Sequence, residues 1–399
     1  MSNNERRVGT VSRGIRCPII RQGDDIAAIA AQSVLDAAAS EGFALRDRDV
    51  IAITESVVAR SQGNYASVQN IADDVRAKLG GETVGVVFPI LSRNRFAILL
   101  RGIAMGCKKV VIQLSYPSDE VGNALVSLDA VDEAGVNPYS DVLSAARFVE
   151  LFGEPKHEFT GVNYLTYYGE IVRAAGAECE IVFANHATDI LKYTDSVITA
   201  DIHSRARSKR LLKAAGAKRV FGLDEILDAP VNGSGCNEKY GLLGSNKSTE
   251  DMVKLFPRDC QGVVEEVQRR ILDATGKRVE VMVYGDGAFK DPQGKIWELA
   301  DPVTSPAFTA GLVGTPNELK LKYLADDKYK DLSGEALKAA ISADIRAKEG
   351  ELVGKMASEG TTPRQLTDLL ASLCDLTSGS GDKGTPIVLV QGYFDNYTN

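Results

Sequence analysis

The sequence Asp49-Val-Ile-Ala-Ile-Thr54 decides the fold class, because it sets a short apolar β-type run directly behind the charged residues 46–49. Apolar residues at helical spacing precede it at residues 25–39, and a second helical pattern at residues 68–79 ends at a glycine pair. Another β-type run follows at residues 83–89. Strand and helix signals therefore alternate, which predicts a mixed α/β (α+β) protein.

The alternation continues to the end of the chain. Strands are predicted at residues 108–114, 180–184, 196–200, 218–221, 279–284 and 386–391, and helices at residues 204–215, 260–274, 335–348 and 363–373. A segment rich in glycine and asparagine, residues 231–237, is the clearest change of composition. It predicts a junction between domains.

Composition narrows the class of function. The chain has 399 residues, of which 44% are hydrophobic and 25% charged, so it can bury a large core. Its net charge is -8 and its basic residues form no long run, which argues against nucleic acid or an anionic membrane as the main partner. Because the sequence has neither an apolar leader nor a stretch of about 18 apolar residues, we expect a cytoplasmic protein that acts on small molecules.

Cysteine and histidine are too sparse for several kinds of site. The six cysteines are far apart and form no CxxC pair, which excludes a zinc ribbon and argues against a disulfide framework. Only three histidines are present, so a Ser-His-Asp triad is hard to assemble. Carboxylates and backbone amides are therefore expected to carry the chemistry.

Three glycine-rich segments could contact an anion, at residues 241–248, 285–287 and 378–386. The first is not a P-loop, because Asn246 stands where that motif has glycine before its lysine. In the third, several glycines allow consecutive N–H groups to converge on an anion, and Lys383 adds a positive charge. A flexible surface turn explains the same composition equally well.

Asp286 follows the predicted strand at residues 279–284 and is flanked by glycines. The carboxyl ends of strands in α/β sheets are where ligands bind, and a carboxylate there suits Mg²⁺. A turn aspartate is an equally good interpretation of the same residues. The residues alone do not decide between the two.

Two stretches near the N-terminus carry a recognisable pattern: Gly14-Ile-Arg-Cys-Pro-Ile-Ile-Arg-Gln-Gly-Asp-Asp-Ile26, and Asp49-Val-Ile-Ala-Ile-Thr-Glu-Ser-Val-Val-Ala-Arg-Ser-Gln-Gly63. They resemble the opening of coenzyme F420-0 γ-glutamyl ligases. Later segments at residues 241–246, 279–290 and 366–392 resemble further parts of that family in the same order. The chain would be a long, divergent form with an extra central region.

The resemblance implies a domain organisation. Residues 1–115 would form the N-terminal part of a ligase core, residues 116–231 a central α/β insertion that could bind the acceptor, and residues 232–399 the C-terminal part with metal and nucleotide loops. It also implies a homodimer.

The resemblance implies a reaction as well. GTP or ATP, with Mg²⁺ or Mn²⁺, would activate a carboxylate of a small-molecule acid such as a deazaflavin or folate. The amine of L-glutamate or a similar amino acid would then attack the acyl phosphate. Asp286 would bind the metal, and Asp286 and Lys383 would be catalytic. The implied nucleotide contacts are Gly14, Ile15, Thr54, Glu55, Arg60, Asn246, Gly379, Ser380, Gly381, Asp382, Gly384 and Thr385.

The sequence departs from the family at the metal site. Leu243 stands where the family has a metal-binding aspartate, and Gly287 and Ser380 replace other polar positions. Glu238, Glu250 and Asp382 are close enough in sequence to compensate as ligands, which is a hypothesis. The lost ligands leave open a second possibility, a non-catalytic protein that binds a nucleotide or phosphorylated metabolite on the same fold.

The acceptor is predicted to contact a basic cluster in the central region. Arg205 and Lys209 are four residues apart on one face of the predicted helix, and His203 precedes them. Such a cluster binds phosphate or carboxylate groups. A solvated basic helix face is the alternative.

Overall fold

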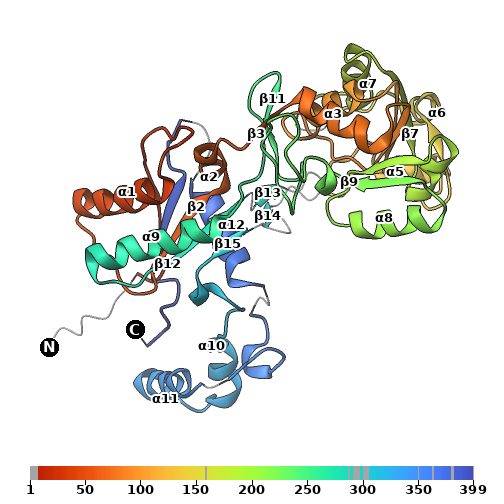
Figure 1. Ribbon diagram of the computed structural model, residues 1–399. Coiled ribbons are helices and arrows are strands. Elements are labelled where there is room, and N and C mark those ends of the chain that lie inside the picture. The colour runs from red at the N-terminus through yellow and green to blue at the C-terminus, as the bar shows by residue number, and fades with distance from the viewer. Residues whose placement is uncertain are drawn as a thin grey trace. The chain divides into compact units, whose positions relative to one another are not determined.

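The computed structural model describes residues 8–157, 160–285, 288–290, 297–299, 305–348, 350–361, 364–378 and 382–398. The chain forms two compact units (Figure 1). Unit 1 comprises Met1–Ser61, Asp259–Phe289 and Glu298–Asn399, and unit 2 comprises Gln62–Arg258 and Lys290–Trp297. Both contain helices packed on sheets, so the predicted mixed α/β fold is confirmed.

The units are divided at other residues than the predicted boundaries after 115 and 231. β4 (Thr83–Val87) and β5 (Lys109–Leu114) precede residue 116, yet they pair with β8 (Ser196–Thr199) and β7 (Glu178–Phe183) in one sheet. This sheet continues across the predicted boundary because strand pairing, which local composition does not report, holds these segments together.

Unit 1 is built on a five-stranded sheet in the order β1-β16-β2-β12-β15. The strands are β1 (Val11–Ile15), β16 (Ile387–Gln391), β2 (Val50–Thr54), β12 (Glu280–Tyr284) and β15 (Ala307–Phe308). β2 and β12 are parallel, whereas β16 is antiparallel to both β1 and β2. The carboxyl ends of β1, β2 and β12 therefore meet the amino end of β16. We call this the Thr54 edge, formed by Ile15, Thr54, Tyr284 and Ile387.

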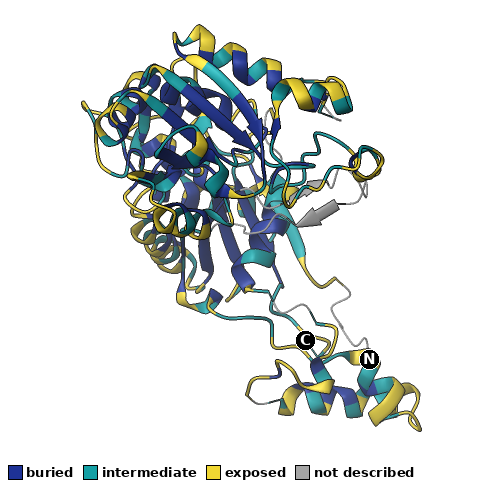
Figure 2. Cartoon of the chain, turned by 90° about the vertical axis from the view of Figure 1, so that its right-hand side faces the viewer, coloured by how far each residue is buried: buried dark blue, intermediate teal, exposed yellow. Residues whose placement is uncertain are grey.

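Alternate residues of these strands face two different apolar clusters. Ile51 and Ile53 face one that includes α1 (Ile26–Glu41) and α9 (Cys260–Thr275), which lie side by side in Figure 1. Val50 and Ala52 face another that includes α12 (Leu366–Ser378). With both faces covered, β2 needs apolar residues at every position, which is why it reads as a continuous apolar run. Figure 2 shows the buried strands beneath helices whose outer faces are exposed.

The remaining helices of unit 1 are shorter or peripheral. A small apolar cluster, which includes Leu324, Ile341 and Ile345, joins the segment around α10 to α11. The elements are α2 (Glu55–Gln62), α10 (Leu321–Tyr323) with a π-helical turn at Leu324–Lys328, and α11 (Gly334–Ala347). A separate two-stranded sheet, which belongs wholly to neither unit, consists of β13 (Ala288–Lys290) and β14 (Trp297–Leu299).

Unit 2 is built on a six-stranded sheet in the order β6-β7-β5-β4-β8-β9, with β6 (Leu143–Ser144) and β9 (Arg219–Gly222) at its edges. All strands except β6 are parallel. The chain passes outward from β4 through β5 to β7, and then crosses to the other side of β4 for β8 and β9. This is a doubly wound arrangement with its switch point between β4 and β8.

Helices cover both faces of this sheet. α3 (Val68–Leu79), α4 (Phe96–Met105) and α7 (Tyr164–Ala174) pack on one face, with α4 so close to α3 that a Cβ on Gly102 would lie 2.7 Å from the Cβ of Ile71. α8 (Arg205–Ala214) packs on the other face. The remaining elements are α5 (Leu128–Glu133), α6 (Ala145–Phe152) and a small sheet of β10 (Asn246–Lys247), β11 (Met252–Lys254) and β3 (Tyr65–Ser67).

Candidate functional site

The Thr54 edge brings together segments from both ends of the chain. The Cys17 N–H donates to the Gly384 carbonyl at 3.3 Å, and the Thr54 N–H donates to the Pro386 carbonyl at 3.0 Å. A Cβ on Gly14 would lie only 3.0 Å from the Cβ of Thr385, so glycine is needed for this close approach. The structure therefore places Gly14, Thr54 and Thr385 beside one another.

Ile15 has a different role from its neighbour Gly14. Its side chain is buried, with 3% exposed, and packs in the apolar cluster under α1 and α9. A ligand at this edge can contact Ile15 only through its backbone.

Helix α2 starts at the Thr54 edge, because Glu55 follows β2 without an intervening loop. The unpaired N–H groups at the start of a helix favour anions. The Glu55 side chain is buried, whereas Arg60 is exposed in the last turn of α2. Burial first, and then the nearby Asp259 and Glu55 carboxylates, raise the pKa of Cys260 to about 12, so this thiol stays protonated and is no nucleophile at neutral pH.

The glycine-rich loop between α12 and β16 is described at its two ends. Asp382, Lys383 and Gly384 are exposed, and the Thr385 hydroxyl donates to the Ser378 carbonyl, which ties the start of β16 to the end of α12. Gly379, Ser380 and Gly381 lie outside the described residues.

The metal ligands stay a prediction. Asp286 and Gly287 lie outside the described residues. The strand β12, which precedes them, ends at the Thr54 edge, where Tyr284 pairs with Thr54. Glu238 is exposed in unit 2, whereas Asp382 belongs to unit 1. Within the described ranges, no three His, Cys, Asp or Glu side chains are grouped so that they could hold a metal ion.

The turn at residues 241–246 lies in unit 2 and is held by backbone contacts. The Gly241 N–H donates to the Asn237 carbonyl at 2.8 Å, and the Leu242 N–H donates to the Leu223 carbonyl at 2.9 Å. Leu243 packs against the apolar core of unit 2. This leucine, predicted to stand where the family has an aspartate, is partly buried against that core. Asn246 follows in β10, so it belongs to unit 2, whereas the other predicted nucleotide contacts belong to unit 1.

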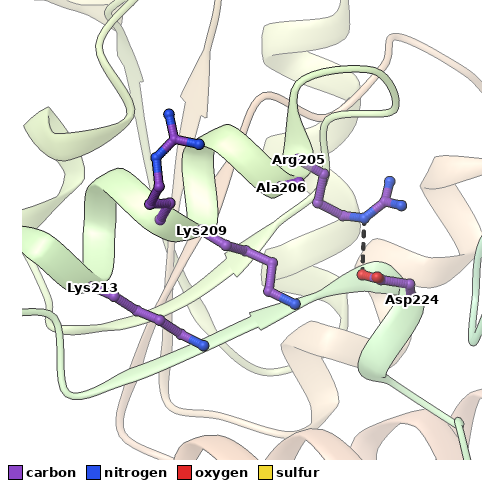
Figure 3. A pocket seen from close by; sticks show the side chains of 6 residues that line it. Arg205, Ala206, Lys209, Lys213 and Asp224 are labelled. Carbon is purple, nitrogen blue, oxygen red and sulfur yellow. Dashed lines mark ion pairs between the residues drawn. The ribbon is translucent and has the colours of Figure 1, made fainter.

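The predicted basic cluster lines a pocket of about 420 Å³ along α8. Arg205 Nε lies 2.8 Å from Asp224 Oδ1 (Figure 3). Lys209 Nζ lies 2.5 Å from Glu225 Oε2. Arg205 Nη1 also donates to the Asp201 carbonyl at 3.0 Å. The structure thus brings Arg205 and Lys209 to one face as predicted, each beside a carboxylate. The lining residues are Arg205, Ala206, Lys209, Arg210, Lys213 and Asp224.

His203 lies apart from these lining residues. It is exposed, and its backbone N–H donates to Glu120 Oε2 at 3.2 Å. The same carboxylate accepts the N–H groups of Ile202 at 2.6 Å and Ser204 at 3.1 Å. Glu120 therefore occupies the anion position at the start of α8.

Sequence reasoning missed a pair of carboxyl groups at this helix start. Ser204 Oγ lies 2.6 Å from Glu120 Oε1 and 2.7 Å from Asp201 Oδ2, and the Ser208 hydroxyl donates to Asp201 Oδ2 at 2.7 Å. A hydroxyl has one proton to donate, so one of the two carboxyl contacts of Ser204 needs a proton on the carboxyl side. Burial raises the pKa of Asp201, and the Glu120 charge adds to the rise although the Ser208 and Ser204 hydrogen bonds oppose it. The fold therefore favours the protonated form of Asp201 more than water does.

Replacing Asp201 with asparagine should preserve this network, because an amide N–H donates to Ser204 as the protonated acid does. The raised pKa means that folded protein holds the proton more tightly than unfolded chain. The stability contributed by the wild-type carboxyl is therefore present at low pH and lost as pH rises through the folded pKa. The free energy of unfolding of Asp201→Asn, relative to that of wild type, should therefore rise by on the order of 1 kcal/mol from pH 4 to pH 8. Urea unfolding at several pH values measures this difference.

Asp195→Asn is the matched control. Its hydrogen bond with Lys218 lowers the pKa of Asp195, so that carboxyl contributes stability at high pH and loses it as pH falls. A pH dependence of the same sign in both variants, or none for Asp201→Asn, would contradict a raised pKa at Asp201.

A family model described as F420-0:Gamma-glutamyl ligase matches residues 14–392. No curated protein matches the chain. In the described part of the chain, no helix has the length and apolar character needed to cross a membrane.

Proposed function

The chain belongs to the F420-0:gamma-glutamyl ligase family, and we propose that it uses GTP or ATP to join the amine of L-glutamate or a similar amino acid to a carboxylate of a cofactor-like acid. The observation that carries this proposal is the convergence of Gly14, Thr54 and Thr385 at the Thr54 edge. These segments are the ones predicted to contact the nucleotide, and they come from near the two ends of the sequence.

The chemistry of the Thr54 edge suits a polyphosphate. The start of α2 offers backbone N–H groups, the glycines let the backbone approach phosphate oxygens, and the exposed Lys383 supplies a positive charge. Such preorganised donors stabilise the charge that develops as a phosphoryl group is transferred. Arg60 can add a second cation from α2 if its flexible side chain turns toward the phosphates.

The proposed reaction has two steps. An oxygen of the acceptor carboxylate attacks the γ-phosphorus, the bond to the β-phosphate breaks, and an acyl phosphate and a nucleoside diphosphate form. The amine nitrogen then attacks the acyl carbon, inorganic phosphate leaves with the electron pair of the C–O bond, and the amine loses its proton to the departing phosphate. Water must be excluded meanwhile, because it competes with the amine for the acyl phosphate.

A non-catalytic protein that binds a nucleotide or phosphorylated metabolite is the competing proposal. Leu243 favours it, since a leucine side chain that packs against the apolar core of unit 2 cannot bind a metal ion as a carboxylate does. The two proposals share the binding site and differ in turnover.

A coupled assay separates them. The full-length protein is incubated with GTP or ATP, Mg²⁺, L-glutamate and a deazaflavin or folate acid, and both phosphate release and the mass of the product are measured. The ligase should release one phosphate per amide formed, and only when both the acid and the amino acid are present. If the protein binds the nucleotide but releases no phosphate with any acceptor, the non-catalytic proposal is supported.

Asp286→Ala tests the predicted role of Mg²⁺ or Mn²⁺. If Asp286 binds the ion, the substitution should weaken nucleotide binding by about tenfold in the presence of Mg²⁺ and leave it unchanged in excess chelator. Calorimetric titration under both conditions measures the difference. Asp36→Ala is the control, because Asp36 is an exposed carboxylate within α1. This variant should bind the nucleotide as wild type does in either buffer. Unchanged Mg²⁺ dependence in Asp286→Ala would exclude this residue as the ligand.

A further inference from the structure

The pocket along α8 carries more positive charge than its carboxylates balance. Arg205, Lys209 and Lys213 follow one another at four-residue spacing, so they share a face of the helix, and Arg210 also lines the pocket. Asp224 pairs with Arg205 and Glu225 with Lys209. Among the residues that the structure describes, Arg210 and Lys213 have no carboxylate within ion-pair distance. The Glu225 charge also acts on Lys213 beyond ion-pair distance, but four cations and two carboxylates leave an excess of two positive charges.

This arrangement is costly for the helix itself. Like charges at four-residue spacing destabilise a helix, and a cation at its first residue, Arg205, opposes the helix dipole. Asp224 and Glu225 offset the cost for two of the cations, and they also fix those side chains, because each is only 17% exposed. The fixed cations and the unpaired ones form a partly preorganised anion site.

The position in the fold is also that of a ligand site. Asp224 and Glu225 follow β9, a parallel strand, so the pocket is at the carboxyl edge of a doubly wound sheet. Its volume of about 420 Å³ fits a small metabolite. Figure 3 shows the side chains of Lys209 and Lys213 extending along the same side of α8 toward the β9 segment.

We propose that the pocket lined by Arg205, Lys209, Arg210 and Lys213 binds a dianionic phosphate group of a small molecule. A phosphate monoester matches two unpaired cations in charge, and arginine and lysine both donate to its oxygens. This site lies in unit 2 and is additional to the nucleotide site proposed at the Thr54 edge. The phosphate belongs either to the acceptor of the ligase reaction or to a separate effector.

Ala206 offers the cleanest test, because it lines the pocket, is exposed and takes part in no ion pair. Ala206→Glu introduces a negative charge into the pocket on a helix-compatible residue, and Ala206→Gln introduces the same bulk without the charge. Calorimetric titration of the full-length protein with inorganic phosphate and with phenyl phosphate, at constant low ionic strength, measures binding.

Wild type and Ala206→Gln should bind both probes saturably, and Ala206→Glu should bind at least about tenfold more weakly. Lys213→Gln should weaken binding several-fold, whereas Lys218→Gln, an exposed cation paired with Asp195 outside the pocket, should not. The proposal is overturned if Ala206→Glu binds as Ala206→Gln does, or if Lys218→Gln has the same effect as Lys213→Gln. These titrations need no turnover, so they can fail or succeed independently of the ligase proposal.

Kinetics then identify the source of the phosphate. If the acceptor supplies it, Ala206→Glu should raise the KM of a phosphate-bearing acceptor and leave the KM of the nucleotide unchanged. If a separate effector supplies it, free phosphate should change kcat in wild type at saturating acceptor, and this response should vanish in Ala206→Glu. Either result supports the site. An active enzyme that shows neither of these effects would contradict the site.

Discussion

Gly241→Ala should lower the free energy of unfolding by about 3 kcal/mol or more. A Cβ at this position would lie 2.6 Å from the carbonyl carbon and oxygen of Asp224 and from the carbonyl oxygen of Ile226. These atoms belong to the backbone, which cannot move aside without breaking the turn that follows β9. The residue also has a positive φ of 50°, which adds a conformational penalty for any side chain.

Gly233→Ala is the matched control, because Gly233 also has a positive φ, of 80°, but has open space where its Cβ would be. It should lose only about 1 kcal/mol. Urea unfolding followed by circular dichroism measures both variants. Equal losses would mean that φ alone, and not the contact with the Asp224 backbone, makes glycine necessary at 241.

Gly14→Val should weaken nucleotide binding by at least about tenfold. Its Cβ would lie 3.0 Å from the Cβ of Thr385 and 3.2 Å from the Thr385 Cγ2 and Oγ1 atoms, and the extra methyl groups increase the overlap. The loop before β16 must then move away from β1, which separates two of the segments proposed to bind the nucleotide. Overpacking of this kind also costs about 1–3 kcal/mol of stability.

Two controls separate binding from folding. Gly9→Val places the same side chain just before β1, where nothing lies within 4 Å of the added Cβ, and it should bind nucleotide as wild type does. Gly14→Ala, with a smaller overlap, should fall between wild type and Gly14→Val in affinity. If Gly14→Val folds and binds the nucleotide with wild-type affinity, Gly14 and Thr385 are not part of the nucleotide site.

Sequence patterns located the central elements well, and the structure shows why. The predicted strand at residues 50–54 is β2, where burial on both faces requires an unbroken apolar run. The predicted helix at residues 68–79 is α3, which Ser67 and Asn70 cap at its start and Gly80 ends with a positive φ. Such local signals are readable because the residues that make them are neighbours in sequence.

Other elements gave no usable pattern. The helix α4 is apolar on nearly every side, with Phe96, Leu100 and Ile103 among its buried residues, so a buried helix and a buried strand are hard to tell apart from its sequence. The strand β1 contains serine, arginine and glycine and is held by pairing with β16 at the other end of the chain. Tertiary contacts specify these elements, and propensity does not.

The candidate sites were likewise predictable only in part. The spacing of Arg205 and Lys209 predicted that they share a helix face, but their pairing with Asp224 and Glu225 depends on where β9 ends. Glu120 reaches the start of α8 from a loop after β5, with no signal in the local sequence. Gly14 and Thr385 were named through family resemblance, and the sheet order provides the physical reason for their proximity.

Hydrogen exchange with and without nucleotide tests the central claim most directly, because it reports where the nucleotide binds without requiring turnover. At saturating GTP or ATP with Mg²⁺, exchange should slow in peptides that cover residues 14–24 and 382–386, and this protection should be lost in Gly14→Val. No protection in these peptides, or protection confined to unit 2, would contradict a nucleotide site at the Thr54 edge.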